Sequence, residues 1–368
     1  MQFDFSDDQK ALQSDVRRFF ERASPISVVR ALIDSDASHE ASLWKQVSEL
    51  GFLAAAIPVE YGGAGAGYLE LCLVAEEVGR ALAPLPAVSS IYQAAELLLL
   101  SGSVAQKERW LPRLANGESI ATIAVAETVG EVTPDRIAAK VTDGKLTGTK
   151  RPVSDGLAAD LAFVAAHGEG GLGLFLAELS LDGVQRSAVK SVDPSRKQAE
   201  LRFNAVAVEQ LGAAGAGQAV LSAMRDRAAV LVAFEQIGGA HAALTMARDY
   251  ALGRYAFGKP IGGFQAIKHM LADMYVSLEL ARSNAYYGAW ALATDASQLS
   301  LAAASARVAA SDAYRHCATN NIHVHGGMGF TWEFDCHLHY RRARYLSSVL
   351  GAPPEWERKL ISAYGRAA

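Results

Sequence analysis

A single acidic residue, Glu235, lies in a long stretch of the chain that is otherwise almost entirely apolar. This stretch, VLVAFEQIGGAHAALTMA, is apolar on nearly every side of a helix, so we expect it to be buried. A carboxylate there loses its hydration, which raises its pKa unless a cation or several donors accompany it. That is typical of a general base held near neutrality. The pattern equally fits a buried glutamate paired with an arginine or lysine of a neighbouring helix, and both interpretations stay open.

Two glycines follow Glu235 by about one helical turn. Each of Gly238 and Gly239 costs the helix about 1 kcal/mol relative to alanine, so we expect something to approach this surface closely. A second helix backbone and a ligand fit the pattern equally well.

Further along the chain, the segment RYAFGKPIGGFQ joins the end of one predicted helix to the start of the next. It places Arg254 and Lys259 beside exposed backbone amides, a corner that suits an anion and in particular a diphosphate. Basic residues near helix ends also simply complement the helix dipole, so this signal is weak by itself.

A third group of residues lies in HVHGGMGFTWEFDCHLHYRRAR. Gly326 and Gly327 give a patch without side chains, where the backbone can meet a phosphate or a ring. The histidines of the segment, with Cys336 between two of them, also suggest a metal site. On a helix, residues two apart point away from each other, so we predict no metal site and expect the histidines to pack and form hydrogen bonds.

Composition excludes several classes of protein. Lysine and arginine total 35 against 39 aspartate and glutamate residues, a formal net charge of −4, so no basic excess favours nucleic acid as a partner. The cysteines, Cys72, Cys317 and Cys336, form neither a disulfide framework nor a CxxC pair. The N-terminus lacks the features of a secretory signal, and no apolar run approaches the roughly 18 to 20 residues of a membrane span. We therefore expect a cytoplasmic protein without membrane contact.

Hydrophobic periodicity divides the chain into three parts. Residues 1–120 show helical spacing, residues 121–215 alternate as short strands, and residues 216–368 return to long helices. Asp143-Gly144 predicts a hairpin turn in the middle part. The predicted fold class is α+β, with an N-terminal helical domain, a middle β domain and a C-terminal four-helix bundle.

Together these segments resemble the acyl-CoA dehydrogenase flavoprotein family over essentially the whole chain. RYAFGKPIGGFQAIKHMLADM is similar to the family's long R-x-x-F-G-x-P-I-x-x-F-Q motif and the L-A-D-M that follows it. HGGMGFTWE resembles its late glycine motif, and ELGFLAAAIPVEYGGAGAG resembles its N-terminal signature.

The resemblance implies a dimer-of-dimers assembly that binds FAD and dehydrogenates an acyl-CoA thioester, with electrons passing to an electron-transfer flavoprotein. Arg254, Phe257 and Gln265 would reach the FAD of a neighbouring subunit, and Gly326 with Gly327 would pack on its adenosine diphosphate part. Ser154 matches the residue that contacts the flavin ring.

The chain differs from the family at the positions of the catalytic base that removes the α-proton. Many members carry it in a late Y-E-G-T segment, which here reads Val349-Leu350-Gly351-Ala352, and others carry it at a position that aligns with Val232. Glu235, three residues later on the same side of the helix, is the predicted α-proton base, with hydride passing to flavin N5. Pro152 and His323 also replace the residues expected in the family.

The segment FTWEFDCHLHYRRA is closest to members that act on CoA esters of steroid side chains and other bulky acids. Several of those are α2β2 heterotetramers in which one type of chain supplies the base and the other completes the FAD site. The alternative prediction is therefore a base-poor subunit of such an enzyme.

Overall fold

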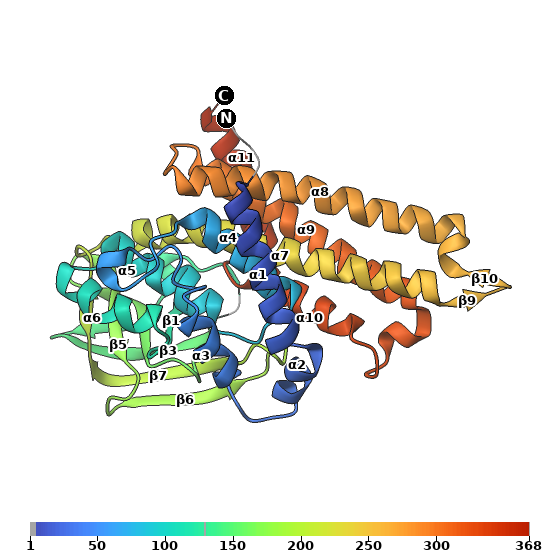
Figure 1. Ribbon diagram of the computed structural model, residues 1–368. Helices are drawn as coiled ribbons and strands as arrows, with labels where there is room; N and C mark the ends of the chain where they lie inside the picture. Colours follow the sequence, from blue (N-terminus) through green and yellow to red (C-terminus); the bar gives the residue numbers. More distant parts are fainter. Residues whose placement is uncertain (1–4, 129, 368) are drawn as a thin grey trace. The chain divides into compact units, whose positions relative to one another are not determined.

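The computed structural model of this protein describes residues 5–128 and 130–367. Backbone contacts divide the chain into two compact units. The first unit consists of Met1–Val29, Cys72–Ala83 and Ala229–Ala368. The second consists of Arg30–Leu71 and Pro84–Ala228. Along the chain the order is helical, then β, then helical, which confirms the predicted fold class (Figure 1). The three predicted domain boundaries stay a prediction.

The α-helices are α1 (Asp7–Ala23), α2 (Ile26–Ile33), α3 (Ala41–Glu49), α4 (Tyr68–Arg80), α5 (Glu96–Ser101), α6 (Val104–Ala115), α7 (Gly217–Gly253), α8 (Gln265–Ala293), α9 (Leu299–His325), α10 (Cys336–Ser348) and α11 (Pro353–Ala367). Shorter turns are the 3₁₀ helices η1 (Val59–Tyr61), η3 (Pro134–Arg136), η4 (Ile261–Gly263) and η5 (Gly326–Phe330) and the π-helix η2 (Val88–Ala95). The strands are β1 (Ala121–Ala124), β2 (Lys140–Thr142), β3 (Lys145–Ser154), β4 (Leu161–Gly168), β5 (Gly171–Glu178), β6 (Val184–Val189), β7 (Gln198–Ala207), β8 (Glu209–Leu211), β9 (Tyr255–Ala256) and β10 (Lys259–Pro260).

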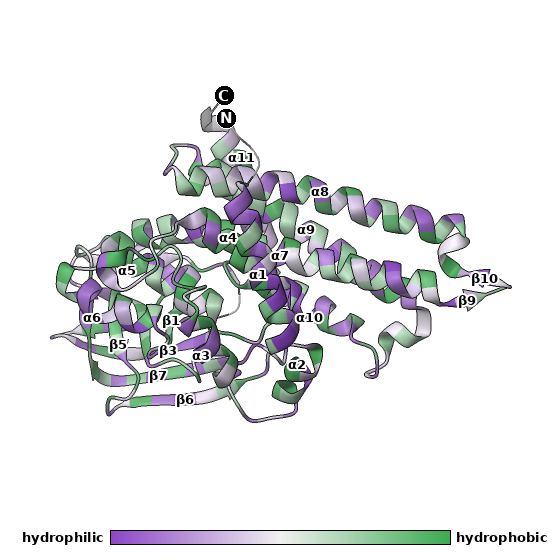
Figure 2. Ribbon diagram, viewed as in Figure 1, coloured by the Kyte–Doolittle hydropathy of each residue, from purple (hydrophilic) through white to green (hydrophobic). Residues whose placement is uncertain are grey.

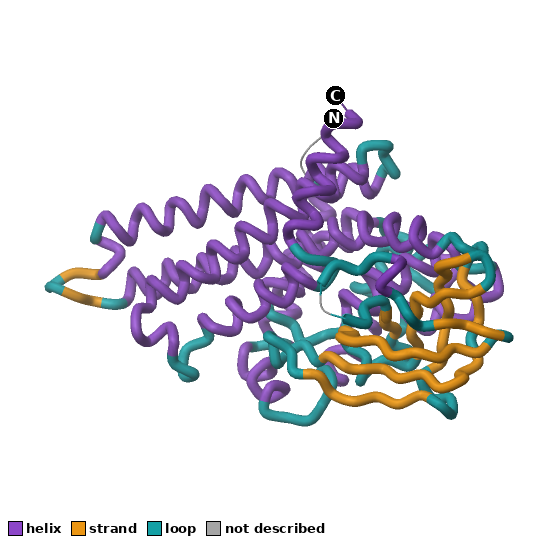
Figure 3. The backbone as a smooth tube through the Cα atoms, turned by 180° about the vertical axis from the view of Figure 1, so that it is seen from behind, coloured by secondary structure: helices purple, strands orange, loops and turns teal. Residues whose placement is uncertain are grey.

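The second unit is built on one mixed sheet, drawn in orange in Figure 3. In the described residues it has eight strands in the order β6-β7-β3-β2-β4-β5-β8, with β1 beside β4. The predicted hairpin is confirmed: Asp143 and Gly144 join β2 to β3, with φ of 50° and 69°. The sequence reasoning did not predict β6, because every residue of this edge strand is at least partly exposed and no alternation marks it.

The first unit is helical. Its long helices α8 and α9 pack along each other, and α10 and α11 also pack on α9. Helix α1 lies at the surface and is coloured mostly as hydrophilic in Figure 2. Its buried residues are Val16 and Phe20, one turn apart on a single apolar face, as amphipathic spacing requires.

Helices α4 and α7 approach within backbone contact at two glycines. A Cβ atom built on Gly79 would lie 1.8 Å from the carbonyl oxygen of Glu235, and one on Gly238 would lie 1.8 Å from that of Glu76. A Cβ on Gly239 would lie 2.4 Å from the ring of Tyr314 on α9. The two glycines singled out in the sequence therefore allow helix packing, which is the first of the two interpretations left open for them.

Helix α7 is more apolar over a longer stretch than expected from the sequence. It is long and apolar enough to cross a membrane by length and composition, although no apolar run of that length was expected. Within the structure, 72% of its most apolar window is buried, as in the core helix of a globular unit, so it is only weak evidence for a membrane span.

Candidate functional site

The predicted base, Glu235, lies on α7 and is completely buried. Its Oε1 atom is 3.6 Å from NH1 of Arg342 on α10, which is also completely buried. This contact is an ion pair and not a hydrogen bond. NH2 of Arg342 donates a hydrogen bond to the carbonyl oxygen of Leu82, at 3.1 Å. The sequence left two interpretations open for Glu235, a general base and a buried glutamate paired with a basic residue. The geometry favours the buried pair.

A further buried arginine holds the same part of α7. Arg307 on α9 donates from NH1 to Oε1 of Gln236 at 2.6 Å and from NH2 to the carbonyl oxygen of Leu346. The hydroxyl of Ser311 lies 3.1 Å from Nε2 of Gln236. Because buried polar groups must find partners, these bonds fix the middle of α7 against α9 and α10.

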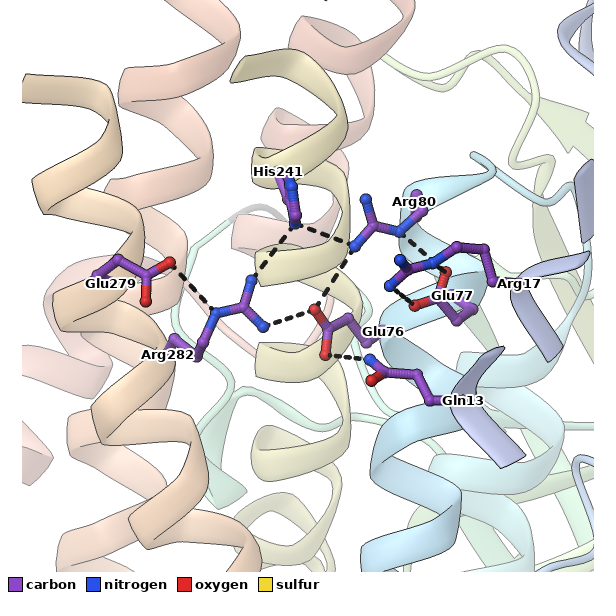
Figure 4. A network of polar contacts seen from close by, with 8 residues as sticks. All are labelled: Gln13, Arg17, Glu76, Glu77, Arg80, His241, Glu279 and Arg282. Carbon is purple, nitrogen blue, oxygen red and sulfur yellow. Dashed lines mark hydrogen bonds and ion pairs between the residues drawn. The ribbon is translucent and has the colours of Figure 1, made fainter. Parts of the chain in front are cut away.

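A larger polar network surrounds two consecutive carboxylates of α4, Glu76 and Glu77, which are both 1% exposed (Figure 4). Arg17 on α1 donates to both oxygens of Glu77, at 2.9 and 3.1 Å, and Arg80 donates to it at 2.9 Å. Arg282 on α8 donates to Glu76 at 2.7 Å. The network thus ties α1 and α8 to α4, since a buried carboxylate is stable only with such donors.

His241 on α7 completes this network. Its Nδ1 atom lies 3.0 Å from NH2 of Arg80 and 3.5 Å from NH2 of Arg282, so it accepts from both guanidinium groups (Figure 4). Burial, followed by the positive charges of Arg80 and Arg282, lowers the pKa of His241 to about 4. The imidazole is therefore neutral near pH 7.

The predicted anion corner forms at the far end of α7. Arg254, Phe257, Lys259 and Gln265 are all exposed, and Phe257 is 96% exposed with a positive φ of 51°. The β9–β10 hairpin that carries Phe257 and Lys259 joins α7 to α8. Within the described chain this ring contacts Phe264 edge to face, with centroids 6.2 Å apart, and is otherwise in solvent.

The predicted glycine patch follows α9. Gly326 has φ 62° and ψ −140°, a conformation that requires glycine. Gly327 is exposed, and a Cβ atom there would meet no heavy atom within 4 Å. Packing within the described chain therefore does not explain glycine at this position. An open backbone in the unit that also carries Arg254 and Gln265 fits the diphosphate of a dinucleotide cofactor.

Glu235 lies in the middle of α7, and the anion corner follows the C-terminal end of this helix. Arg254 follows Glu235 by 19 positions, so the two lie about 28 Å apart along the axis. This separation agrees with the two predicted roles, because the resemblance assigns Glu235 to one FAD site and Arg254 to the FAD of a neighbouring subunit.

Ser154, the predicted flavin-ring contact, ends β3 in the second unit and is partly exposed. Its carbonyl oxygen accepts from the hydroxyl of Thr122 at 2.6 Å, and it pairs with Gln198 of β7. The residue after it, Asp155, has a positive φ of 55° and is bound by Ser89 at 2.7 Å. The backbone of Ser154 is thus held in place, and the contact of its side chain with a flavin stays a prediction.

The histidines considered as metal ligands lie on helices. His323 and His325 are on α9, and His337 and His339 are on α10. Within residues 5–128 and 130–367, no group of three His, Cys, Asp or Glu side chains is arranged to hold a metal ion. His325 and His339 instead contact Tyr250 and Tyr314, which is the packing role predicted for them.

The sequence reasoning missed Arg342 and the pair Glu76-Glu77. The adjacent glutamates lie in the apolar run LCLVAEEVG, so they carry the same signal as Glu235 and could have been found by it. Arg342 is one of several arginines in YRRAR, and only the packing of α10 selects it as the partner.

Two family descriptions match the chain: "Acyl-CoA dehydrogenase, N-terminal domain" over residues 6–118 and "Acyl-CoA dehydrogenase, C-terminal domain" over residues 214–362. The chain belongs to the acyl-CoA dehydrogenase family. This is a family of FAD-dependent oxidoreductases, so the resemblance, the enzyme class and the cofactor predicted from the motifs are confirmed.

The chain is similar to steroid-type members of the family. It is 33% identical to acyl-CoA dehydrogenase IpdE2 of Mycobacterium tuberculosis over 97% of each chain. It matches the structure of the ChsE4-ChsE5 complex from the same organism with a TM-score of 0.90 and 27% identity over 99% of each chain. It also matches the Tcur3481-Tcur3483 steroid ACAD G363A variant with a TM-score of 0.88 and 28% identity over 98% of each chain.

Proposed function

We propose that this chain is the base-poor subunit of an α2β2 acyl-CoA dehydrogenase, in which a partner chain of the same fold carries the α-proton base. The observation that carries the proposal is the pair of Glu235 with Arg342, both completely buried. The positions that align with the family's base hold Val232 and Val349-Leu350-Gly351-Ala352, none of which is acidic. The similarity to the ChsE4-ChsE5 complex supports a heteromer.

The reaction is α,β-dehydrogenation of an acyl-CoA thioester, in which the partner's carboxylate takes the α-proton. FAD held by Arg254, Gln265, Gly326 and Gly327 would supply the acceptor for the hydride of the β-carbon. A thioester α-proton is too weakly acidic for a carboxylate unless donors stabilise the enolate oxygen and water is excluded. An electron-transfer flavoprotein is the proposed electron acceptor.

This chain's own part is to complete the partner's FAD site. Arg254 supplies positive charge to the diphosphate, and Gln265 supplies an amide for hydrogen bonds. Gly326 and Gly327 let the backbone approach the adenosine diphosphate without side chains. Phe257 covers the cofactor with an apolar ring that is exposed in the chain alone.

The proposed substrate is the CoA ester of a steroid side chain or another bulky acid. The segment FTWEFDCHLHYRRA and the similarity to the Tcur3481-Tcur3483 steroid ACAD support this class. The proposed location is the cytoplasm, as the absence of a disulfide framework suggests.

The second candidate function is that of a homotetrameric acyl-CoA dehydrogenase in which Glu235 is the base and Ser154 contacts the flavin. The apolar surroundings predicted for Glu235 favour it. It requires the contact between Glu235 and Arg342 to open in the complex with substrate.

Purified protein separates the two candidates. The chain is expressed alone and with an acyl-CoA dehydrogenase chain of the same genome that has a glutamate at the position of Val232 or in the segment 349–352. FAD content, subunit ratio and anaerobic bleaching of the flavin by acyl-CoA esters are measured. We expect a 1:1 complex that bleaches with bulky esters, and no bleaching by this chain alone.

Two variants of α7 sharpen the test. In the complex, Glu235→Gln is expected to leave the bleaching rate within about threefold of the wild type, as is Asp249→Asn, an exposed carboxylate of the same helix. Bleaching by the isolated chain, lost in Glu235→Gln and kept in Asp249→Asn, would establish the second candidate instead.

A further inference from the structure

The glycine patch is anchored by His325, the residue just before it. The His325 side chain is 5% exposed, and its Nδ1–H donates to the carbonyl oxygen of Asn321 one turn earlier, at 2.8 Å. Burial lowers the pKa of this imidazole, so the ring is neutral near pH 7. Further along, a Cβ on Gly329 would lie 3.0 Å from Cβ of His325, so the chain folds back over the histidine.

Two aromatic rings enclose the imidazole. The ring of Tyr250 on α7 stacks on it with centroids 4.0 Å apart and an angle of 25°. The ring of Phe334 meets its edge at 5.7 Å and meets Tyr250 at 6.1 Å. Such a cluster fixes the orientation of the imidazole, since each ring contact prefers a defined geometry.

Tyr250 also holds the anion corner. Its carbonyl oxygen accepts the backbone amide of Arg254 at 2.8 Å, and the carbonyl oxygen of Arg254 accepts the amide of Ile261 at 2.8 Å. One residue therefore contacts both the backbone of Arg254 and the histidine that precedes Gly326.

We propose that His325 and Tyr250 are positioning residues that hold the backbone of Gly326-Gly327 at a fixed place relative to Arg254, so that the two bind one dinucleotide diphosphate together. The inference rests on the proposed function, because it takes these residues to complete an FAD site. The stack transmits no charge and touches no reacting atom. It acts by removing conformational freedom from the two segments before the cofactor binds.

The test measures the FAD dissociation constant of the complex by flavin fluorescence, beside the melting temperature and the KM for acyl-CoA at saturating FAD. His325→Ala removes the hydrogen bond and the stack, and is expected to weaken FAD binding about tenfold. His325→Phe keeps a ring and should weaken it only about threefold, and Tyr250→Phe should bind like the wild type. The KM for acyl-CoA should not change.

The matched control is His339→Phe. His339 is also a buried histidine of the same unit beside a tyrosine ring, with its Nδ1 atom 3.1 Å from the hydroxyl of Tyr314. This variant is expected to lower the melting temperature while FAD binding stays unchanged.

Three results would overturn the inference. If His325→Ala and His325→Phe lower the melting temperature but bind FAD like the wild type, the stack is only structural. If His339→Phe weakens FAD binding as much as His325→Phe, the effect is general destabilisation. A wild-type complex that holds no FAD would overturn the proposed function itself, and the inference with it.

Discussion

The middle of α7 and its C-terminal end use polar residues in opposite ways. In the middle, Glu235 is completely buried beside Arg342, and Gly238 is covered by the backbone of α4. At the end, Arg254 and Phe257 are exposed, and the neighbouring Gly327 has open space where a side chain would lie. Packing within the described chain therefore explains the charge and the glycine in the middle of α7 but not those at its end, and burial distinguishes the two regions.

The largest expected loss of stability follows substitution of Arg342, which pairs with Glu235 in the middle region of α7. Arg342→Met leaves the buried carboxylate of Glu235 without its guanidinium, so we expect the free energy of unfolding to fall by about 4 kcal/mol. Urea unfolding of the variant measures this. The double variant Arg342→Met/Glu235→Leu should recover most of the loss. A stability equal to the wild type for Arg342→Met alone would show that the pair does not support the fold.

The next largest expected loss of stability follows substitution of Gly238, in comparison with Gly253. Gly238→Ala places a Cβ atom 1.8 Å from the carbonyl oxygen of Glu76, so the helices must separate at a cost of about 3 kcal/mol. Gly253→Ala, at the end of the same helix, meets no heavy atom within 4 Å and should be tolerated. Thermal unfolding compares the two. Equal melting temperatures would contradict the close contact of α4 with α7.

The exposed end should affect binding and leave stability unchanged. Arg254→Gln is expected to weaken FAD binding by the heteromeric complex about tenfold, because a charge-assisted contact with the diphosphate is lost. Its melting temperature without FAD should match the wild type, since the side chain is exposed. A lower melting temperature with unchanged FAD affinity would show that Arg254 supports packing and not FAD binding.

A further contrast is the pH dependence of stability, which depends on His241. Its pKa falls from 6.5 in the unfolded chain to about 4 in the fold, so the unfolded state takes up the proton first. The stabilising contribution of the neutral imidazole is complete above pH 6.5 and is lost as the pH falls from 6.5 toward 4. His241→Gln keeps an acceptor for the arginines and should lose less stability than the wild type over that interval. Parallel melting curves across this pH range would contradict the assignment.

The sequence predicted the elements well where one face of each is buried. The long helices and the β2–β3 turn follow from periodicity and from the Asp-Gly pair. Strand β6 was missed because exposed residues occupy both of its faces. A helix was expected in the region of Val88–Ala95, and only its π-helical form was not predicted. The roles of the site residues could be predicted only in part, since a lone acid in an apolar helix gives one signal for a base and for a structural ion pair.

The sequence by itself determined the family, through motifs whose residues are adjacent in the chain, and the apolar character of α7, which is a local property. Only the tertiary structure decided that Arg342 faces Glu235, that Gly238 meets α4 and that Gly327 stays open. These partners are distant in the chain, and burial depends on which helix surfaces meet. The periodicity of one segment cannot encode the identity of the segment that covers it.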